Sequence, residues 1–75
     1  MPYVSIKAYP RDEAVKNRLV EEVNKVFLDV LGCPPEAMTI SVEDVEPEDW
    51  DEKVQKPEIM TNLDKMKILD GIKKY

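Results

Sequence analysis

The sequence predicts an α/β fold: a βαβ unit with parallel strands, followed by a helical tail. Two observations indicate the strands, because apolar and polar residues alternate over residues 3–9 and again over residues 38–43. A third indicates the helix between them, because apolar residues recur every three or four positions over residues 15–31. Strands joined through a crossover helix lie parallel, and the crossover is right-handed.

The first predicted strand covers residues 3–9 and ends at Pro10. The residues of its apolar face would be Val4, Ile6 and Ala8. The residues of its polar face would be Tyr3, Ser5 and Lys7. Such alternation is typical of a strand that is covered on one side only.

The predicted helix follows Asp12, which is a suitable N-cap, and Glu13 adds negative charge to its first turn. Its apolar positions are Val15, Leu19, Val20, Val23, Val26, Phe27, Val30 and Leu31. Gly32 suits the left-handed conformation that closes a helix, and Pro34 and Pro35 prevent its continuation. The second predicted strand then has Met38, Ile40 and Val42 on its apolar face.

The last third of the chain is predicted to be helical. Pro47, in the acidic stretch 46–49, indicates the start of a short helix that carries Trp50. Pro57 predicts a break or kink near Lys56, because the residue before a proline avoids the α region. A further helix is expected over residues 58–70, closed by Gly71. Its inward residues would be Ile59, Met60, Leu63, Met66, Ile68 and Leu69.

The chain has 75 residues and is expected to form a single domain over residues 1–75. A monomer of this size buries only about 60% of the surface that its unfolded chain exposes. Two strands also leave two bare sheet edges. We therefore expect a homodimer in which two copies pair into a four-stranded sheet with helices on one face, and a hexamer is the alternative.

Composition narrows the classes of partner. The net charge of -5 disfavours nucleic acid, for which a basic surface would be expected. No apolar run approaches the roughly 18 residues of a membrane span, and residues 1–10 lack the apolar core of a signal peptide. With a single cysteine, Cys33, the chain is expected to be soluble and cytoplasmic, with no membrane partner.

The chain contains no histidine, so the commonest general base and the Ser/His and Cys/His pairs are excluded. Pro2 offers another base. Once Met1 is removed, its nitrogen becomes a secondary amine at the chain terminus, and terminal amines have a reference pKa of about 7.7 to 8.0. Desolvation or a neighbouring cation would leave such an amine largely neutral at physiological pH.

A βαβ chain that opens Met-Pro, with Arg11 after its first strand and Leu31-Gly32 at the end of its helix, resembles the tautomerase superfamily. The resemblance is to the 4-oxalocrotonate tautomerase-like group. The stretch from Glu46 to Trp50 with a helical tail is similar to its longer, PptA-type subgroup. In that subgroup, helix is expected to replace the C-terminal hairpin of the short enzymes, and dimers are usual.

The resemblance implies a cofactor-free keto-enol tautomerase. Pro2 would move the proton as general base and acid, Arg11 would hold a substrate carboxylate, and Trp50 would form an aromatic wall that excludes water. These roles agree with physical chemistry, since a guanidinium fork suits a carboxylate and low dielectric strengthens charge stabilisation. No metal or cofactor is implied.

One position departs from the family pattern, because Thr39 stands where the short enzymes carry a second arginine. A substrate with one carboxylate and an aromatic tail, of the phenylpyruvate enol type, therefore fits better than a dicarboxylate. The alternative is a non-catalytic module for small-molecule binding or oligomerisation on the same scaffold. Hydrolysis of a 3-haloacrylate would need more arginines than this chain offers near the site.

Overall fold

The computed structural model describes all residues, 1–75, and they form two compact units. We call Met1–Val45 unit 1 and Glu46–Tyr75 unit 2, and describe each by itself. No helix in either unit has the combined length and apolar character needed to cross a membrane.

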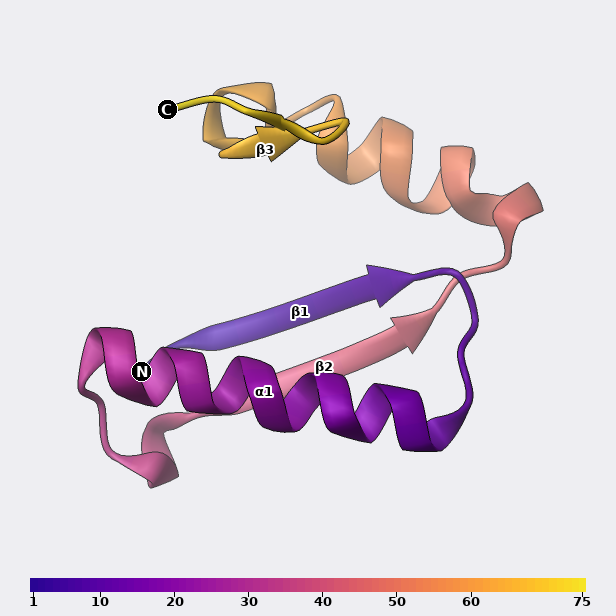
Figure 1. The fold of residues 1–75 in the computed structure, drawn as a ribbon. Helices are drawn as coiled ribbons and strands as arrows, with labels where there is room; N and C mark the ends of the chain where they lie inside the picture. Colours follow the sequence, from indigo (N-terminus) through magenta and orange to yellow (C-terminus); the bar gives the residue numbers. More distant parts are fainter. The chain divides into compact units, whose positions relative to one another are not determined.

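Unit 1 is the predicted βαβ unit (Figure 1). Strand β1 (Tyr3–Ala8) leads through helix α1 (Glu13–Leu31) and the short 3-10 turn η1 (Pro35–Ala37) to strand β2 (Thr39–Asp44). The two strands are parallel, in a register that pairs Tyr3 with Thr39 and Ala8 with Asp44. The fold class predicted for this part of the chain is confirmed.

Both ends of α1 are fixed by the residues that the sequence indicated. The Asp12 side chain accepts a hydrogen bond from the backbone N–H of Val15 at 2.9 Å. Gly32 has φ 67°, in the left-handed region, and its N–H donates to the carbonyl of Leu28 at 3.0 Å. These caps satisfy backbone groups that a helix terminus otherwise leaves without partners.

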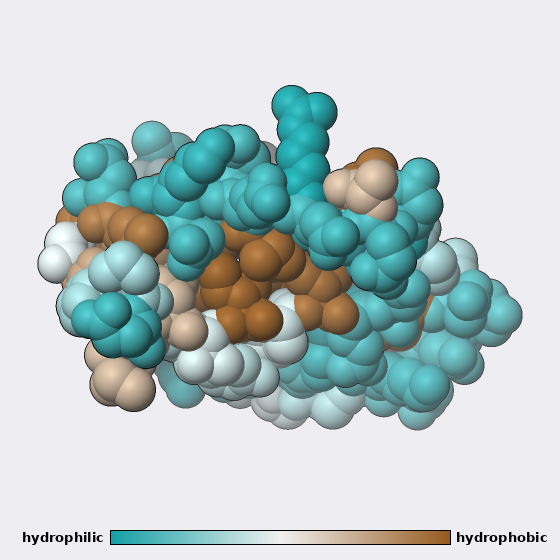
Figure 2. Space-filling view, turned by 90° about the horizontal axis from the view of Figure 1, so that it is seen from below, coloured by the Kyte–Doolittle hydropathy of each residue, from teal (hydrophilic) through white to brown (hydrophobic).

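Unit 1 buries little of its apolar surface. Its only buried apolar residues are Ala37 and Val45, and α1 has none. Val26 and Val30 are 57% and 73% exposed. Val26 also lines shallow apolar hollows on α1 together with Val23, Phe27, Val30 and Leu31. Figure 2, which views the side on which α1 lies in Figure 1, shows apolar atoms gathered in a hollow among hydrophilic side chains.

Unit 2 begins with the 3-10 turn η2 (Pro47–Asp49), which continues through Trp50 into the π-helix η3 (Asp51–Ile59). Of the predicted break or kink near Lys56, the break is wrong, because η3 passes through Pro57 without interruption. The wider turn of a π-helix places hydrogen bonds five residues apart, as from the N–H of Met60 to the carbonyl of Gln55 at 2.9 Å. Pro57 itself has no N–H and donates no hydrogen bond within η3.

The helix predicted over residues 58–70 is also wrong. After η3 the chain forms the 3-10 turn η4 (Leu63–Lys65) and an antiparallel hairpin of β3 (Ile68–Leu69) and β4 (Ile72–Lys73). The two residues between these strands, Asp70 and Gly71, both have positive φ, 50° and 80°. Asp-Gly is a favoured pair for such a hairpin turn, so Gly71 turns a hairpin and does not close a helix.

Candidate active site

Pro2 lies immediately before β1, at the amino end of the two-stranded sheet. Met1 is completely exposed, whereas Pro2 is half-buried. While Met1 is attached, the Pro2 nitrogen is a tertiary amide without basicity. Because Met1 is fully exposed, its removal would free the secondary amine without unpacking unit 1.

The surroundings of Pro2 are polar on one face of the sheet. Tyr3, which follows Pro2, pairs with Thr39, and Ser5 pairs with Ser41. Hydrogen bonds from the Ser5 hydroxyl, and then from the Ser41 hydroxyl, lower the pKa of the Tyr3 phenol from its usual value. Three hydroxyl groups therefore form a cluster on this face, and the side chain opposite Tyr3 has no charge.

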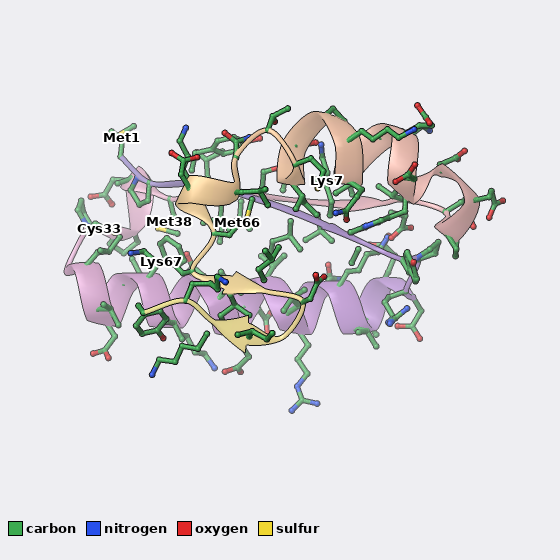
Figure 3. The ribbon with its side chains drawn as sticks, turned by 90° about the horizontal axis from the view of Figure 1, so that it is seen from above. Met1, Lys7, Cys33, Met38, Met66 and Lys67 are labelled. Atoms are coloured by element: carbon green, nitrogen blue, oxygen red, sulfur yellow. The ribbon has the colours of Figure 1, made fainter.

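Sulfur atoms lie at the same end of the sheet. The Cys33 thiol donates to the thioether of Met38 at 3.7 Å, and both side chains are partly buried. Figure 3 shows that Met1, Cys33 and Met38 gather at one end of β1 and β2. The amino end of the sheet thus combines a soft apolar cluster with the position of Pro2.

Arg11 lies at the other end of β1, in the loop that leads into α1. Its side chain is exposed, and Nη1 donates to the carbonyl of Pro10 at 3.0 Å. The guanidinium forms no ion pair. Most of its donors are therefore available to an anion, and a carboxylate suits their planar arrangement.

Acidic side chains border the same loop, but each has another partner. Asp12 caps α1 through the N–H of Val15. Glu13 and Asp44 both pair with Lys16, whose Nζ lies 2.9 Å from Glu13 Oε1 and 3.1 Å from Asp44 Oδ2. These bonds, to Glu13 first and then to Asp44, raise the pKa of Lys16. The sequence interpretation missed Lys16 and Asp44 because they are 28 residues apart in the sequence, where each is an ordinary surface charge.

The structure does not bring Pro2 and Arg11 of one chain together. They flank β1 on opposite sides, and its six residues span about 20 Å at roughly 3.3 Å per residue. A small 2-oxo acid is much shorter than this separation. A site that uses both residues must take them from two copies of the chain.

Trp50 belongs to unit 2, where it is half-buried at the point where η2 meets η3. The backbone N–H of Trp50 donates to the carbonyl of Pro47, the first residue of η2. Val54, one turn further along η3, is the buried residue of this unit. The predicted short helix that carries Trp50 is therefore present, as a 3-10 turn joined to a π-helix.

Comparison with known proteins agrees with this fold. Residues 2–52 match the family described as tautomerase enzyme. A probable tautomerase of Xylella fastidiosa is 36% identical over 62 residues, which cover 81% of this chain and 76% of that protein. Tautomerase PptA of Cronobacter sakazakii is 30% identical over 66 residues, covering 85% of this chain and 87% of the relative.

Tautomerase PptA of Enterobacter sp. (strain 638) is 29% identical over 68 residues, which cover 88% of this chain and 90% of that protein. The chain belongs to the tautomerase family. Family membership and the names of these relatives support tautomerase activity, an isomerase reaction, for this chain.

Proposed function

We propose that this protein is a cofactor-independent keto-enol tautomerase of small 2-oxo acids, with Pro2 as its general base and acid. The observation that carries the proposal is that the family match begins at Pro2 and leaves out Met1. The complete exposure of Met1 supports the same role, because the residue that blocks the amine is accessible.

The reaction needs one proton to move between two atoms. The neutral Pro2 nitrogen takes the proton from the enol hydroxyl, and electron density passes through the enolate toward C3. The prolinium then donates that proton to C3, which forms the 2-oxo acid and regenerates the amine. A positioned base near its optimal pKa contributes about 10² to 10⁴ in rate to such a transfer.

Arg11 binds the substrate carboxylate in this proposal and draws electron density toward it. Its guanidinium is suited to the task because it is exposed and forms no ion pair. A cation near Pro2 would also lower the pKa of the amine and keep it neutral. Each role requires the Arg11 of one chain to approach the Pro2 of another.

We propose that two copies supply this arrangement by pairing their β1 edges in antiparallel orientation about a two-fold axis. The amino end of one β1 then lies beside the carboxyl end of the other, so each dimer holds two sites. The two-stranded sheet has free edges for such pairing. The exposed Val26 and Val30 of α1 give the dimer apolar surface to bury.

The substrate class follows from the polarity near Pro2. Thr39 pairs with Tyr3, one residue from the base, and offers a hydroxyl in place of a second cation. One carboxylate group on the substrate is then matched by Arg11 alone. Trp50 is proposed as the wall against the apolar tail, which favours an aromatic tail as in the phenylpyruvate enol.

The test is the ketonisation of phenylenolpyruvate by the protein without Met1, confirmed by intact mass. Pro2→Ala should lower kcat/KM strongly, because a primary amine differs in basicity and geometry. Pro34→Ala, the same change next to η1, is the matched control. Equal turnover by the Pro2 variant would refute the proposed base, and binding of the enol without turnover would favour a binding module.

A further inference from the structure

We propose that Lys16 is a positioning residue that keeps Arg11 available by engaging the carboxylates of Glu13 and Asp44. This inference rests on the proposed function, since it concerns how Arg11 remains free to bind a substrate carboxylate. Lys16 itself does not contact the substrate in this view. It acts on the two acidic side chains that would otherwise compete.

The position of Lys16 is unusual for a lysine. Residues 16, 20, 23 and 27 share the inward face of α1, and the other three are the half-buried Val20, Val23 and Phe27. The side chain of Lys16 is only 16% exposed. A charge at such a place loses hydration, so it persists where it gains specific partners.

Asp44, the strand partner of Lys16, has a side chain that is 39% exposed. Residues 40, 42 and 44 alternate onto one face of β2, and the first two are the half-buried Ile40 and Val42. Its carboxylate accepts a hydrogen bond from the Lys16 ammonium at 3.1 Å, which links β2 to α1. A largely covered ammonium on the helix, bonded to a carboxylate on the neighbouring strand, indicates a specific arrangement at this end of the sheet.

The two carboxylates that bind Lys16 stand at the two ends of the loop that carries Arg11. The loop starts after Ala8, which pairs with Asp44 and accepts a hydrogen bond from the N–H of Val45 at 2.9 Å. It ends at Glu13, the other partner of Lys16 at 2.9 Å. Both carboxylates that Lys16 holds therefore border the loop that carries the unpaired guanidinium.

Loss of the lysine has a defined chemical consequence. In Lys16→Met, the carboxylates of Glu13 and Asp44 lose the cation that they bind. Arg11, in the loop between them, is then the cation with which they can form an ion pair. An exposed ion pair that competes with the substrate should raise KM for a carboxylate substrate by about threefold. The proton transfer itself should be preserved, so kcat should stay close to the wild-type value.

The experiment compares KM and kcat for phenylenolpyruvate and for the enol of its methyl ester. Lys16→Met should raise KM for the acid only, and Lys16→Arg should behave as wild type. Adding Glu13→Gln and Asp44→Asn to Lys16→Met should restore KM, because no competing carboxylate remains. Lys25→Met, which removes the exposed pair with Glu22 on the same helix, is the control and should change neither constant.

A lysine that only stabilises the fold predicts different results. Adding the two amide substitutions would then leave KM high, and KM would rise equally for the acid and for the methyl ester. Either outcome overturns the inference. Asp44→Asn alone guards against a misfolded Lys16 variant: its KM should be at or below the wild-type value, and a rise would refute competition by Asp44.

Arg11→Ala, measured in the same assays, distinguishes a failure of the Lys16 inference from a failure of the proposed function. If this variant loses its preference for the acid while Lys16→Met is silent, the inference fails and the proposed function stands. If Arg11→Ala keeps the preference, the role of Arg11 in the proposed function fails, and the inference fails with it.

Discussion

Pro2 and Arg11 flank β1 at opposite ends, so the six residues of the strand separate the predicted base from the predicted carboxylate ligand. The family resemblance predicts that the two residues serve one site. At roughly 3.3 Å per residue, the six residues of β1 make a site within a single chain too long for a small acid. In the proposed function, a second copy that runs in the opposite direction supplies the missing residue, and this leads to a direct test.

Mixing two impaired variants should restore activity. Pro2→Ala and Arg11→Ala each lose every site in their own homodimers, but a mixed dimer regains one complete site. Equimolar exchange should give about a quarter of wild-type activity, because half the dimers are mixed and each has one of two sites. The measurement is phenylenolpyruvate turnover after subunit exchange. Persistent inactivity despite proven exchange would contradict a shared site.

Blocking the amine should abolish turnover. A chain extended by Gly-Ser before Pro2 keeps the nitrogen as an amide, and we expect a loss of about 10² or more, the contribution of a positioned base. The matched control carries the same two residues after Tyr75, which is exposed. Intact mass establishes the N-terminus of each sample. Full activity in the blocked protein would rule out Pro2 as the base.

The hydroxyl cluster should be visible in a titration of tyrosine absorbance. Tyr3 should ionise below 10.0 because Ser5 and Ser41 donate to its oxygen. Ser41→Ala should move its midpoint upward, whereas Thr39→Val, which changes the residue opposite Tyr3, should leave it in place. Tyr3→Phe identifies this signal among the three tyrosines. A midpoint unaffected by Ser41→Ala would show that the hydroxyl does not reach Tyr3.

The same lowered pKa gives a pH dependence of stability. The unfolded phenol keeps its proton to higher pH than the folded one, so unfolded chains bind more protons between the two pKa values. Stability from Tyr3 should therefore rise with pH through this window and be lost as pH falls through the folded pKa. The difference in unfolding free energy between wild type and Tyr3→Phe, measured by urea unfolding from pH 8 to 11, checks the sign.

The N-cap of α1 should contribute measurably to stability. Asp12→Ala removes the bond from the N–H of Val15 and should cost about 1 kcal/mol. Asp12→Asn keeps an acceptor and should cost less. Asp29→Ala, near the other end of α1, is a control without a cap to lose. Thermal unfolding followed by circular dichroism gives the comparison, and equal melting temperatures for Asp12→Ala and wild type would exclude the cap.

The parts of the fold that the sequence predicts correctly are those whose signals act between residues close together in the chain. Unit 1 was predictable because alternation, the Asp12 cap and Gly32 all act within a few residues. The tail was not, because Leu63, Met66 and Leu69 have the spacing of a helix while Asp70 and Gly71 adopt positive φ and turn a hairpin. A π-helix through Pro57 has no comparable local signature.

The residues of the candidate site also fall into two groups, those that the sequence indicates and those that only the fold brings together. Pro2 and Arg11 were found by their order along the chain, which resemblance can match. The pairing of Lys16 with Asp44 depends on α1 lying against β2 and cannot be seen from spacing. A search for charged residues at inward positions of both elements would have found it.

The hydrogen bond from the N–H of Val45 to Ala8 is the final backbone link of unit 1, after which the chain enters unit 2. In the proposed function, the amine and the cation both precede this link, and the aromatic wall follows it. Residues up to Val45 then carry the proton transfer, and residues after it select the apolar tail of the substrate. Under this proposal, substitutions beyond Val45 would change which substrate tails are accepted and leave the proton-transfer residues unchanged.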